Sequence, residues 1–236
     1  MLGVLVNVLT VVVGGSLGLL LKRGIPKKVS GAAMSAIGLC TLLIGMDGAM
    51  NGGNILVAIV SLVGGVILGT LLNIDGGLQK LGNRLETVMG KSGEGSIARG
   101  FVTASLLFCV GAMTIVGSLE SGLTGNHRLI FTKSALDFVS SMMLASTLGV
   151  GVVLAGGFVL VVQGGLVLLA GILAPVLSET VITEITCVGS LMILGLGLNL
   201  LNITKLKVAD FLPALLLAPL VSMIGKWLSA LLPFLG

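Results

Sequence analysis

Charged residues are scarce in this sequence. Of its 236 residues 9% carry a charge, against about 25% in an average soluble domain, and 56% are apolar. This composition excludes a large soluble catalytic or nucleic-acid-binding module. The sequence has instead several uncharged runs long enough to cross a bilayer as a helix, which takes about 20 residues. These runs are 1–21, 48–74, 100–119, 138–178 and 185–204, with shorter ones at 29–46 and 211–225.

Residues that carry chemistry are also rare. The chain has one histidine, three cysteines, one tryptophan and no tyrosine. A single histidine cannot supply the paired ligands of a typical zinc site. With seven phenylalanines and one tryptophan, the chain has few aromatic platforms for stacking on nucleic acid bases. No Gly-x-Ser-x-Gly nucleophile motif occurs. We therefore expect no enzyme activity, no cofactor and no nucleic acid partner.

The few basic residues indicate an orientation in the membrane. Lys22, Arg23, Lys27 and Lys28 follow the first run, and a second basic group lies between residues 80 and 99. By the positive-inside rule both loops are cytoplasmic, which places the N-terminus outside. The first run has no basic residue before it and no cleavage motif after it, so we expect a retained span rather than a removable signal peptide.

An internal repeat runs through the chain. The segments 38–45, 109–117 and 187–195 share a pattern of small and apolar residues, and each is followed by a short polar stretch that ends at an asparagine. Transporter folds are often built from such repeats. We expect one membrane domain, 1–236, with repeats 1–54, 55–126 and 127–202 and a terminal helix 208–232.

These observations predict an all-α, polytopic membrane protein of about seven helices, within a range of six to eight. The expected spans are 2–21, 31–46, 55–72, 100–119, 134–162, 180–200 and 208–232. Seven spans give the repeated units one orientation and leave Lys205 and Lys207 outside. Alternatively, the long run 138–178 holds two spans broken near Gly149, which gives eight spans and moves both lysines to the cytoplasmic side. We prefer seven because the repeated units then keep one orientation.

Two further patterns point to packing and to the membrane surface. Small residues recur at helical spacing, as at Gly14 and Gly18 or at Ser61, Gly65 and Gly69, and this lets helices approach closely in lipid. Residues 76–95 carry apolar side chains at helical spacing among polar ones. This pattern predicts a short amphipathic helix at the inner membrane surface.

Polar residues that follow the repeated segments are the candidate binding residues. Asp47 and Glu120 occupy matching places in the first two repeats, and Asn199 does so in the third. If the units surround one axis, these side chains converge near the outer mouth, where carboxylate and amide oxygens suit a hard cation or a polar solute. The complete candidate set is Asp47, Asn51, Asn54, Glu120, Asn126, Asn199 and Asn202. The alternative is that these residues only turn the chain at the interface.

Other polar residues admit simpler interpretations. Asp137 is expected near a helix start, paired with Lys133 one turn away, and Gln163 is expected in a turn. Glu184 is expected near the inner start of its span, where a proton-relay role rests on position alone. His127 and Glu120 are seven residues apart, but a solvated loop histidine is the simpler interpretation.

Five stretches resemble the YdfK/YqgA-like family of bacterial multipass membrane proteins, a domain of unknown function (554). They are 3–7, 22–26, 38–54, 108–120 with Gly122, and 195–202. The resemblance implies a bacterial cytoplasmic (inner) membrane location and supplies neither an activity nor site residues.

Taken together, the sequence favours a transporter or channel for a small ion or polar solute, embedded in the lipid bilayer. The alternative is a structural or regulatory membrane protein without a transported substrate. The oligomeric state is open, a homo-oligomer included.

Overall fold

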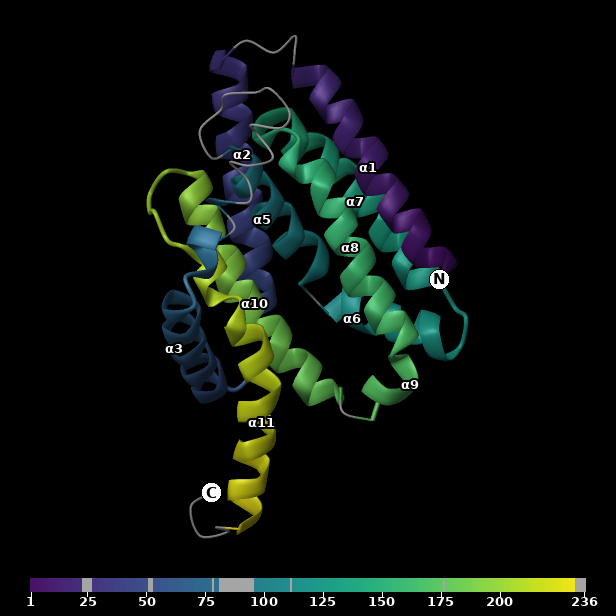
Figure 1. Ribbon diagram of the computed structural model, residues 1–236, viewed down its shortest axis with the longest axis vertical. Helices are drawn as coiled ribbons and strands as arrows, with labels where there is room; N and C mark the ends of the chain where they lie inside the picture. Colours follow the sequence, from purple (N-terminus) through teal and green to yellow (C-terminus); the bar gives the residue numbers. More distant parts are fainter. Residues whose placement is uncertain are drawn as a thin grey trace.

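Helices make up nearly all of the described part of the chain. The computed structural model describes residues 1–22, 27–50, 53–77, 79–80, 96–110, 112–175 and 177–231, and no strand occurs among them. The expected all-α class is therefore confirmed. In chain order the helices are α1 (Leu2–Lys22), α2 (Lys27–Met50), α3 (Ile55–Leu71), α5 (Ser96–Cys109), α6 (Ala112–Leu123), α7 (Arg128–Leu148), α8 (Gly151–Leu168), α9 (Ala170–Leu173), α10 (Glu179–Leu200), the 3-10 helix η1 (Val208–Phe211) and α11 (Pro213–Leu231) (Figure 1).

The described helices include several that match a membrane in length and composition. Five are long and apolar enough to cross it, and α5 and α6 together form a sixth candidate that is bent by 60°. Two shorter apolar helices, Ser35–Met50 and Ile55–Leu71, add to these. The polytopic architecture expected from the sequence is thus confirmed.

The single span expected at 134–162 is wrong. Two helices, α7 and α8, occupy this stretch, and Gly149 separates them with a φ of +83°. This backbone conformation strains residues that have a Cβ and suits glycine. The chain reverses there, because Gly15 of α1 lies against Val153 of α8 whereas Gly164, further along α8, lies near Met1. The structure therefore matches the alternative of a break near Gly149.

Helix directions define two ends of the molecule. α1 runs parallel to α7, since Gly3 contacts Ile130 and Gly18 contacts Met142. We call the end at which both helices begin the Met1 end. The opposite end, at which α5 begins, is the Arg99 end (Figure 1).

α2 and α10 pack against each other along much of their length, as α1 and α7 do, but they are antiparallel. Gly38 lies against Leu201, whereas Gly53 lies against Cys187. α10 therefore runs from the Met1 end to the Arg99 end, and α2 runs the other way. The expectation that all repeated units keep one orientation is wrong for α10.

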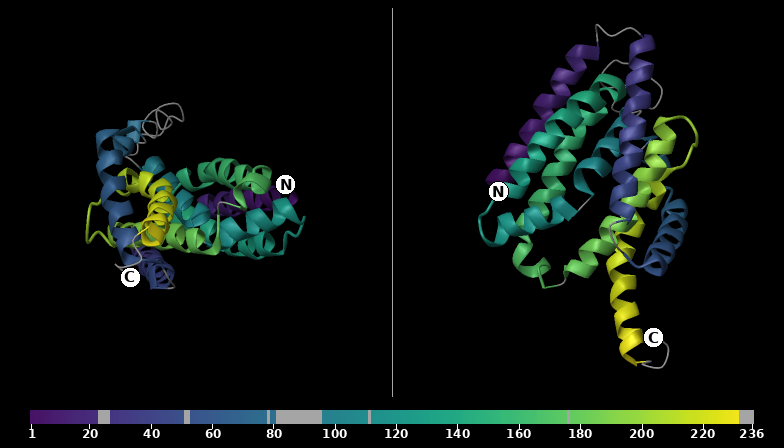
Figure 2. Two further views of the ribbon diagram at one scale, coloured as in Figure 1. Left: turned by 90° about the horizontal axis from the view of Figure 1, so that it is seen from below. Right: turned by 180° about the vertical axis from the view of Figure 1, so that it is seen from behind.

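α5 lies at the centre of the bundle. Its Phe108 is 1% exposed and belongs to a core cluster with residues of α1, α2, α7, α8 and α10. Figure 2 shows α1, α7 and α8 grouped on one side of the molecule, with α3 and α11 on the other. α5 therefore joins the two groups.

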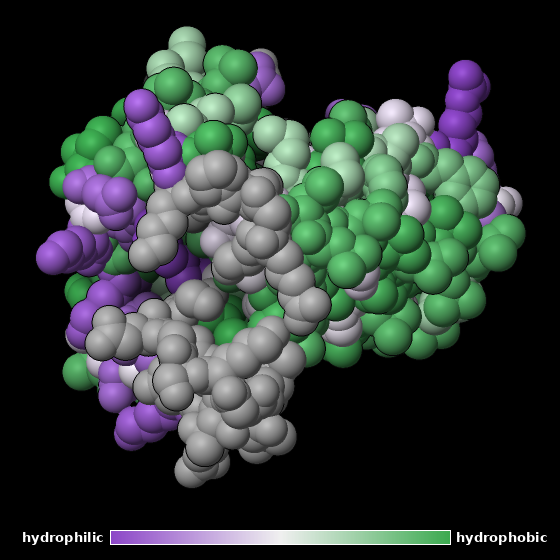
Figure 3. Space-filling model, turned by 90° about the horizontal axis from the view of Figure 1, so that it is seen from above, coloured by the Kyte–Doolittle hydropathy of each residue, from purple (hydrophilic) through white to green (hydrophobic). Residues whose placement is uncertain are grey.

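The outer surface is suited to lipid. Many large apolar side chains are exposed along α1, α3 and α7, including Leu9, Ile55 and Leu136. Seen from the Arg99 end, the flanks are largely hydrophobic and the hydrophilic side chains gather on one part of that end (Figure 3). Of the amphipathic helix expected at 76–95, only 76–77 and 79–80 are described, so that prediction lies largely outside the described residues.

Glycines allow the closest helix contacts, as the small-residue pattern predicted. Gly14 faces Ser141 and the Phe138 carbonyl group of α7, and Gly18 faces the Met142 carbonyl group and Ala145. On the other side of the molecule, Gly65 of α3 lies against Ala214 of α11. A Cβ at any of these positions would force the helices apart.

We predict that Gly18→Ala lowers the free energy of unfolding by about 1–3 kcal/mol, because the added methyl group overpacks the α1–α7 contact. The matched control is Gly157→Ala on α8, where an added Cβ has no neighbour within 4 Å. Thermal unfolding of both variants in detergent measures the difference. Equal midpoints for the two variants would contradict this packing.

Candidate functional site

An ion pair is buried inside the α1, α7 and α8 group. Lys133 and Asp137 lie one turn apart on α7, with 2.5 Å between Nζ and Oδ2 and side chains only 7% and 8% exposed. At 1.5 Å rise per residue they lie about 8 Å and 14 Å beyond the first residue of α7. The pairing expected from the sequence is confirmed, and its depth in the span was not foreseen.

Two amide side chains extend the pair into a network. Asn7 of α1 donates hydrogen bonds from Nδ2 to Asp137 Oδ2 and to Gln163 Oε1, each at 3.1 Å. Asn7 and Gln163 are both fully buried. The network therefore ties α1, α7 and α8 together. The turn expected at Gln163 is wrong, because this residue lies within α8.

The network retains unused hydrogen-bonding capacity. Among the described residues, Asn7 Oδ1 and Gln163 Nε2 are buried without a hydrogen-bond partner. A buried polar atom without a partner costs about 1–3 kcal/mol. An acceptor and a donor thus stand open beside a buried carboxylate.

Apolar layers enclose the network on both sides. Val4, Ile130 and Val167 form a buried cluster one helical turn toward the Met1 end. Val11 and Val159 of the main core lie one turn toward the Arg99 end. The polar groups therefore form an isolated layer between two apolar layers.

The bend between α5 and α6 adjoins this layer. The Lys133 Nζ lies 5.9 Å from the centre of the Phe108 ring, near the end of α5. Thr114 of α6 donates from its hydroxyl group to the Phe108 carbonyl oxygen at 3.1 Å. The interruption of the helix thus lies directly beside the buried ion pair.

Four residues of the set predicted from sequence lie toward the Met1 end. Asp47 is exposed on α2. Asn54 caps α3, and its backbone N–H donates to both carboxylate oxygens of Glu184, at 2.9 and 3.0 Å. Glu120 Oε1 accepts a hydrogen bond from Asn126 Nδ2 at 2.6 Å. Glu184 is 3% exposed and lies at the Met1 end. From the sequence we expect Glu184 on the inner side of the membrane and the N-terminus outside. These two expectations conflict, because Glu184 and the N-terminus lie at the same end of the molecule.

Asn199 and Asn202 lie at the opposite end. Asn199 accepts at Oδ1 from the Leu206 N–H and donates from Nδ2 to the Leu206 carbonyl oxygen, which closes the loop after α10. Asn202 adopts a φ of +58° in that loop. Asn54 contacts Glu184, and the 15 residues of α10 from there to Asn199 span about 22 Å. The expected convergence of the set at one mouth is therefore wrong, and Asn51 lies outside the described residues.

The structure also bears on other residues for which the sequence suggests a role. His127 Nδ1 is 2.8 Å from Ser121 Oγ, whereas Glu120 bonds Asn126, so the two do not form an acid–base pair. No group of three or more His, Cys, Asp or Glu side chains suited to a metal ion occurs among the described residues. Sequence reasoning missed Asn7, although the one amide side chain in an uncharged span was the available signal.

The comparisons with known proteins agree with this architecture. Residues 2–223 match the family described as "Protein of unknown function (DUF554)". The chain belongs to this family. One relative, "Uncharacterized membrane protein YdfK" of Bacillus subtilis (strain 168), is 32% identical over 94% of this chain and 95% of its own length.

A second family relative is "Uncharacterized protein YqgA" of Escherichia coli (strain K12). It is 29% identical over 96% of this chain and 98% of its own length. No solved structure matches the chain. The family and the helices together establish a membrane protein with several spans.

We predict that Asp137→Asn lowers the free energy of unfolding by about 3–5 kcal/mol, because it leaves the Lys133 ammonium group buried without its counter-charge. The double variant Lys133→Met/Asp137→Leu removes both charges, and we expect it to recover most of this loss. Thermal unfolding in detergent measures both. A single variant as stable as the wild type would show that Lys133 does not depend on Asp137.

Proposed function

We propose that the protein moves a small ion or polar solute across the membrane, and that Lys133, Asp137, Asn7 and Gln163 form the polar point on its path. The observation that carries this proposal is the buried ion pair beside the bend between α5 and α6. The established facts are the membrane architecture and the family, and transport is the step beyond them.

The energetics of the ion pair support a functional role. Ionisable groups within membrane spans are expensive, and where they occur they commonly mark ion or solute pathways. A purely structural tie between α1, α7 and α8 needs only neutral side chains. The presence of a lysine and an aspartate at this depth therefore favours a functional role, in which the two charged groups exchange their binding partners.

The unused atoms suggest how a solute binds. Asp137 Oδ2 accepts from both Lys133 and Asn7. A cation or a hydrogen-bond donor that enters the layer competes with Lys133 for this carboxylate, and Asn7 Oδ1 offers a second acceptor. The displaced ammonium group has the Phe108 ring as an alternative neighbour, and such cation–π contacts are favourable in dry surroundings.

The bend between α5 and α6 supplies the means of opening. Discontinuous helices form the substrate sites of many transporters, because their ends present backbone groups and they move as separate segments. α5 contacts the α1, α7 and α8 group and also α10. A change in the angle between α5 and α6 would reposition Phe108 beside Lys133.

The distribution of basic residues supports a cytoplasmic Arg99 end. Lys28, Arg99, Lys205 and Lys207 lie at that end, whereas Arg128 lies at the Met1 end. By the positive-inside rule we propose that the N-terminus lies outside a bacterial inner membrane. Lys205 and Lys207, which the seven-span interpretation left outside, join the cytoplasmic group.

The proposed transport function is tested by measuring the flux of ions or solutes across the membrane of proteoliposomes. Vesicles with the wild-type protein should dissipate at least one imposed gradient of H⁺, Na⁺ or K⁺, or swell in an isosmotic neutral solute such as glycerol. Lys133→Met/Asp137→Leu should abolish this flux and still fold, because it keeps the site packed and removes its charges.

Asp47→Asn and Glu120→Gln are the matched controls, since these carboxylates lie outside the buried layer, and they should keep the wild-type rate. If the folded double variant transports as the wild type does, the buried pair is not on the path. If no gradient or solute in the panel moves, the alternative of a membrane protein without a transported substrate is favoured.

A further inference from the structure

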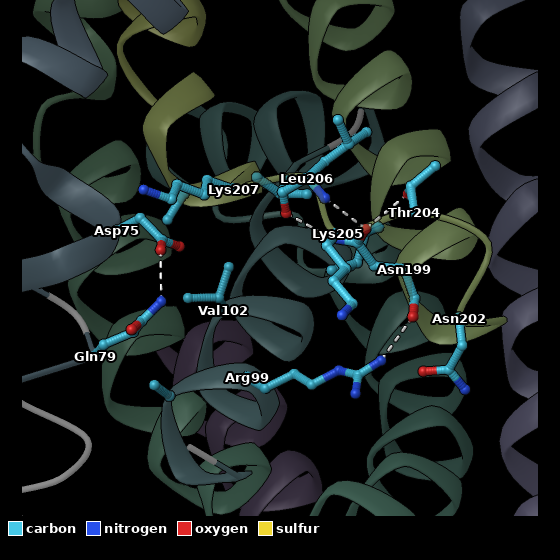
Figure 4. A pocket seen from close by; sticks show the side chains of 14 residues that line it. Asp75, Gln79, Arg99, Val102, Asn199, Asn202, Thr204, Lys205, Leu206 and Lys207 are labelled. Carbon is cyan, nitrogen blue, oxygen red and sulfur yellow. Dashed lines mark hydrogen bonds between the residues drawn. The ribbon is translucent and has the colours of Figure 1, made fainter. Parts of the chain in front are cut away.

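A second polar feature, a pocket of about 740 Å³, opens at the Arg99 end. The start of α5, the end of α10, the loop after α10 and the short helical stretch that follows α3 surround it (Figure 4). The polar residues that line it are Asp75, Gln79, Arg99, Asn199, Asn202, Thr204, Lys205 and Lys207. Pockets of this size accommodate small-molecule ligands.

Three basic side chains, Arg99, Lys205 and Lys207, line the pocket. None of them forms a salt bridge within the described part of the chain, where Lys133–Asp137 is the one such pair. Figure 4 shows the Arg99 side chain crossing the pocket, where its Nη2 donates to the Asn199 carbonyl oxygen at 2.8 Å. Among the described residues the Asn199 carbonyl group is the one hydrogen-bond partner of this guanidinium group, which has further N–H donors for a ligand.

The acidic side chain that lines the pocket, Asp75, forms hydrogen bonds with neighbouring residues. Asp75 Oδ2 accepts from Gln79 Nε2 at 2.6 Å, and the Asp75 N–H donates to Asp210 Oδ1 at 2.8 Å. Burial raises the pKa of the Asp75 carboxyl group, and the nearby Asp210 carboxylate raises it further, against the opposing effect of Lys207. Asp75 therefore brings one carboxyl group, already hydrogen-bonded to Gln79, to a pocket that holds three basic side chains.

One wall of the pocket is apolar. Ala98 and Val102 come from α5, Leu196 comes from α10, and Val208 belongs to η1. Leu196 and Val208 are buried in one core cluster, against which Val102 packs, so the pocket lies where the apolar core meets the basic end. A ligand there can combine an anionic group with an apolar or a soluble remainder.

We propose that this pocket binds a phosphate ester, through Arg99, Lys205 and Lys207. Arginine presents a planar fork that matches two phosphate oxygens, and lysine adds a compact charge. The phosphate group has two sources, the headgroup of an anionic phospholipid and a soluble phosphate ester. The site is separate from the buried ion pair and does not depend on transport.

The full-length protein in neutral detergent is titrated with sn-glycerol 3-phosphate in one arm and with short-chain phosphatidylglycerol in the other, and calorimetry gives Kd. Phosphatidylcholine, which has no net charge, is the control for lipid binding in general. Binding in the first arm identifies a soluble ester, and binding in the second arm alone identifies a lipid headgroup. Either result supports the site if it depends on the pocket lysines.

Lys205→Gln and Lys207→Gln should each weaken Kd about tenfold, the size expected for loss of one charged hydrogen bond, and Lys205→Arg should retain most of the affinity. The matched control is Lys28→Gln, an exposed lysine of the same end that does not line the pocket. The proposal is overturned if neither probe binds, if both pocket variants bind as the wild type does, or if Lys28→Gln weakens binding equally.

Discussion

Burial of the Lys133–Asp137 pair sets the requirements that the surrounding helices meet. Two charges in an apolar bundle are tolerated only when each is paired and hydrogen-bonded. Asn7 supplies that bond from α1, and its short side chain reaches Asp137 only if the two backbones are close. Gly14 and Gly18 make this approach feasible, because a Cβ at either position would collide with α7. The glycine pattern and the polar network are therefore two parts of one arrangement.

The same arrangement explains why the network is a better candidate site than the exposed loops. Loop residues such as Asn54, Asn126 and Asn199 have their side chains engaged in caps and turns. Asn7 and Gln163 instead keep an acceptor and a donor free in a layer enclosed by apolar residues. The bend between α5 and α6 adjoins that layer. These features are the ones on which the proposed transport function rests, in place of a ring of ligands at one mouth.

The sequence predicted the helices well, and the placement of the candidate site poorly. Uncharged runs locate the spans because the bilayer dictates their length. Similarity between segments, however, carries no information on direction. The extra reversal at Gly149 adds one crossing, which turns α10 over and moves Asn199 and Asn202 to the Arg99 end. The role of Asn7 depends on which helix faces it, and a single apolar span does not specify its neighbour.

Access of water to the buried layer tests the central claim most directly. The native cysteines are replaced, and Gln163→Cys is introduced as the one cysteine of the chain. Intact membranes that contain this variant are treated with a small, charged methanethiosulfonate reagent, which reacts with thiolates in water. Val161→Cys, on the exposed face of α8, is the matched control for a lipid-facing position. A path through the layer predicts that Cys at position 163 is labelled and Cys at 161 is not. Labelling at neither position would contradict the account and leave the ion pair as a sealed structural tie.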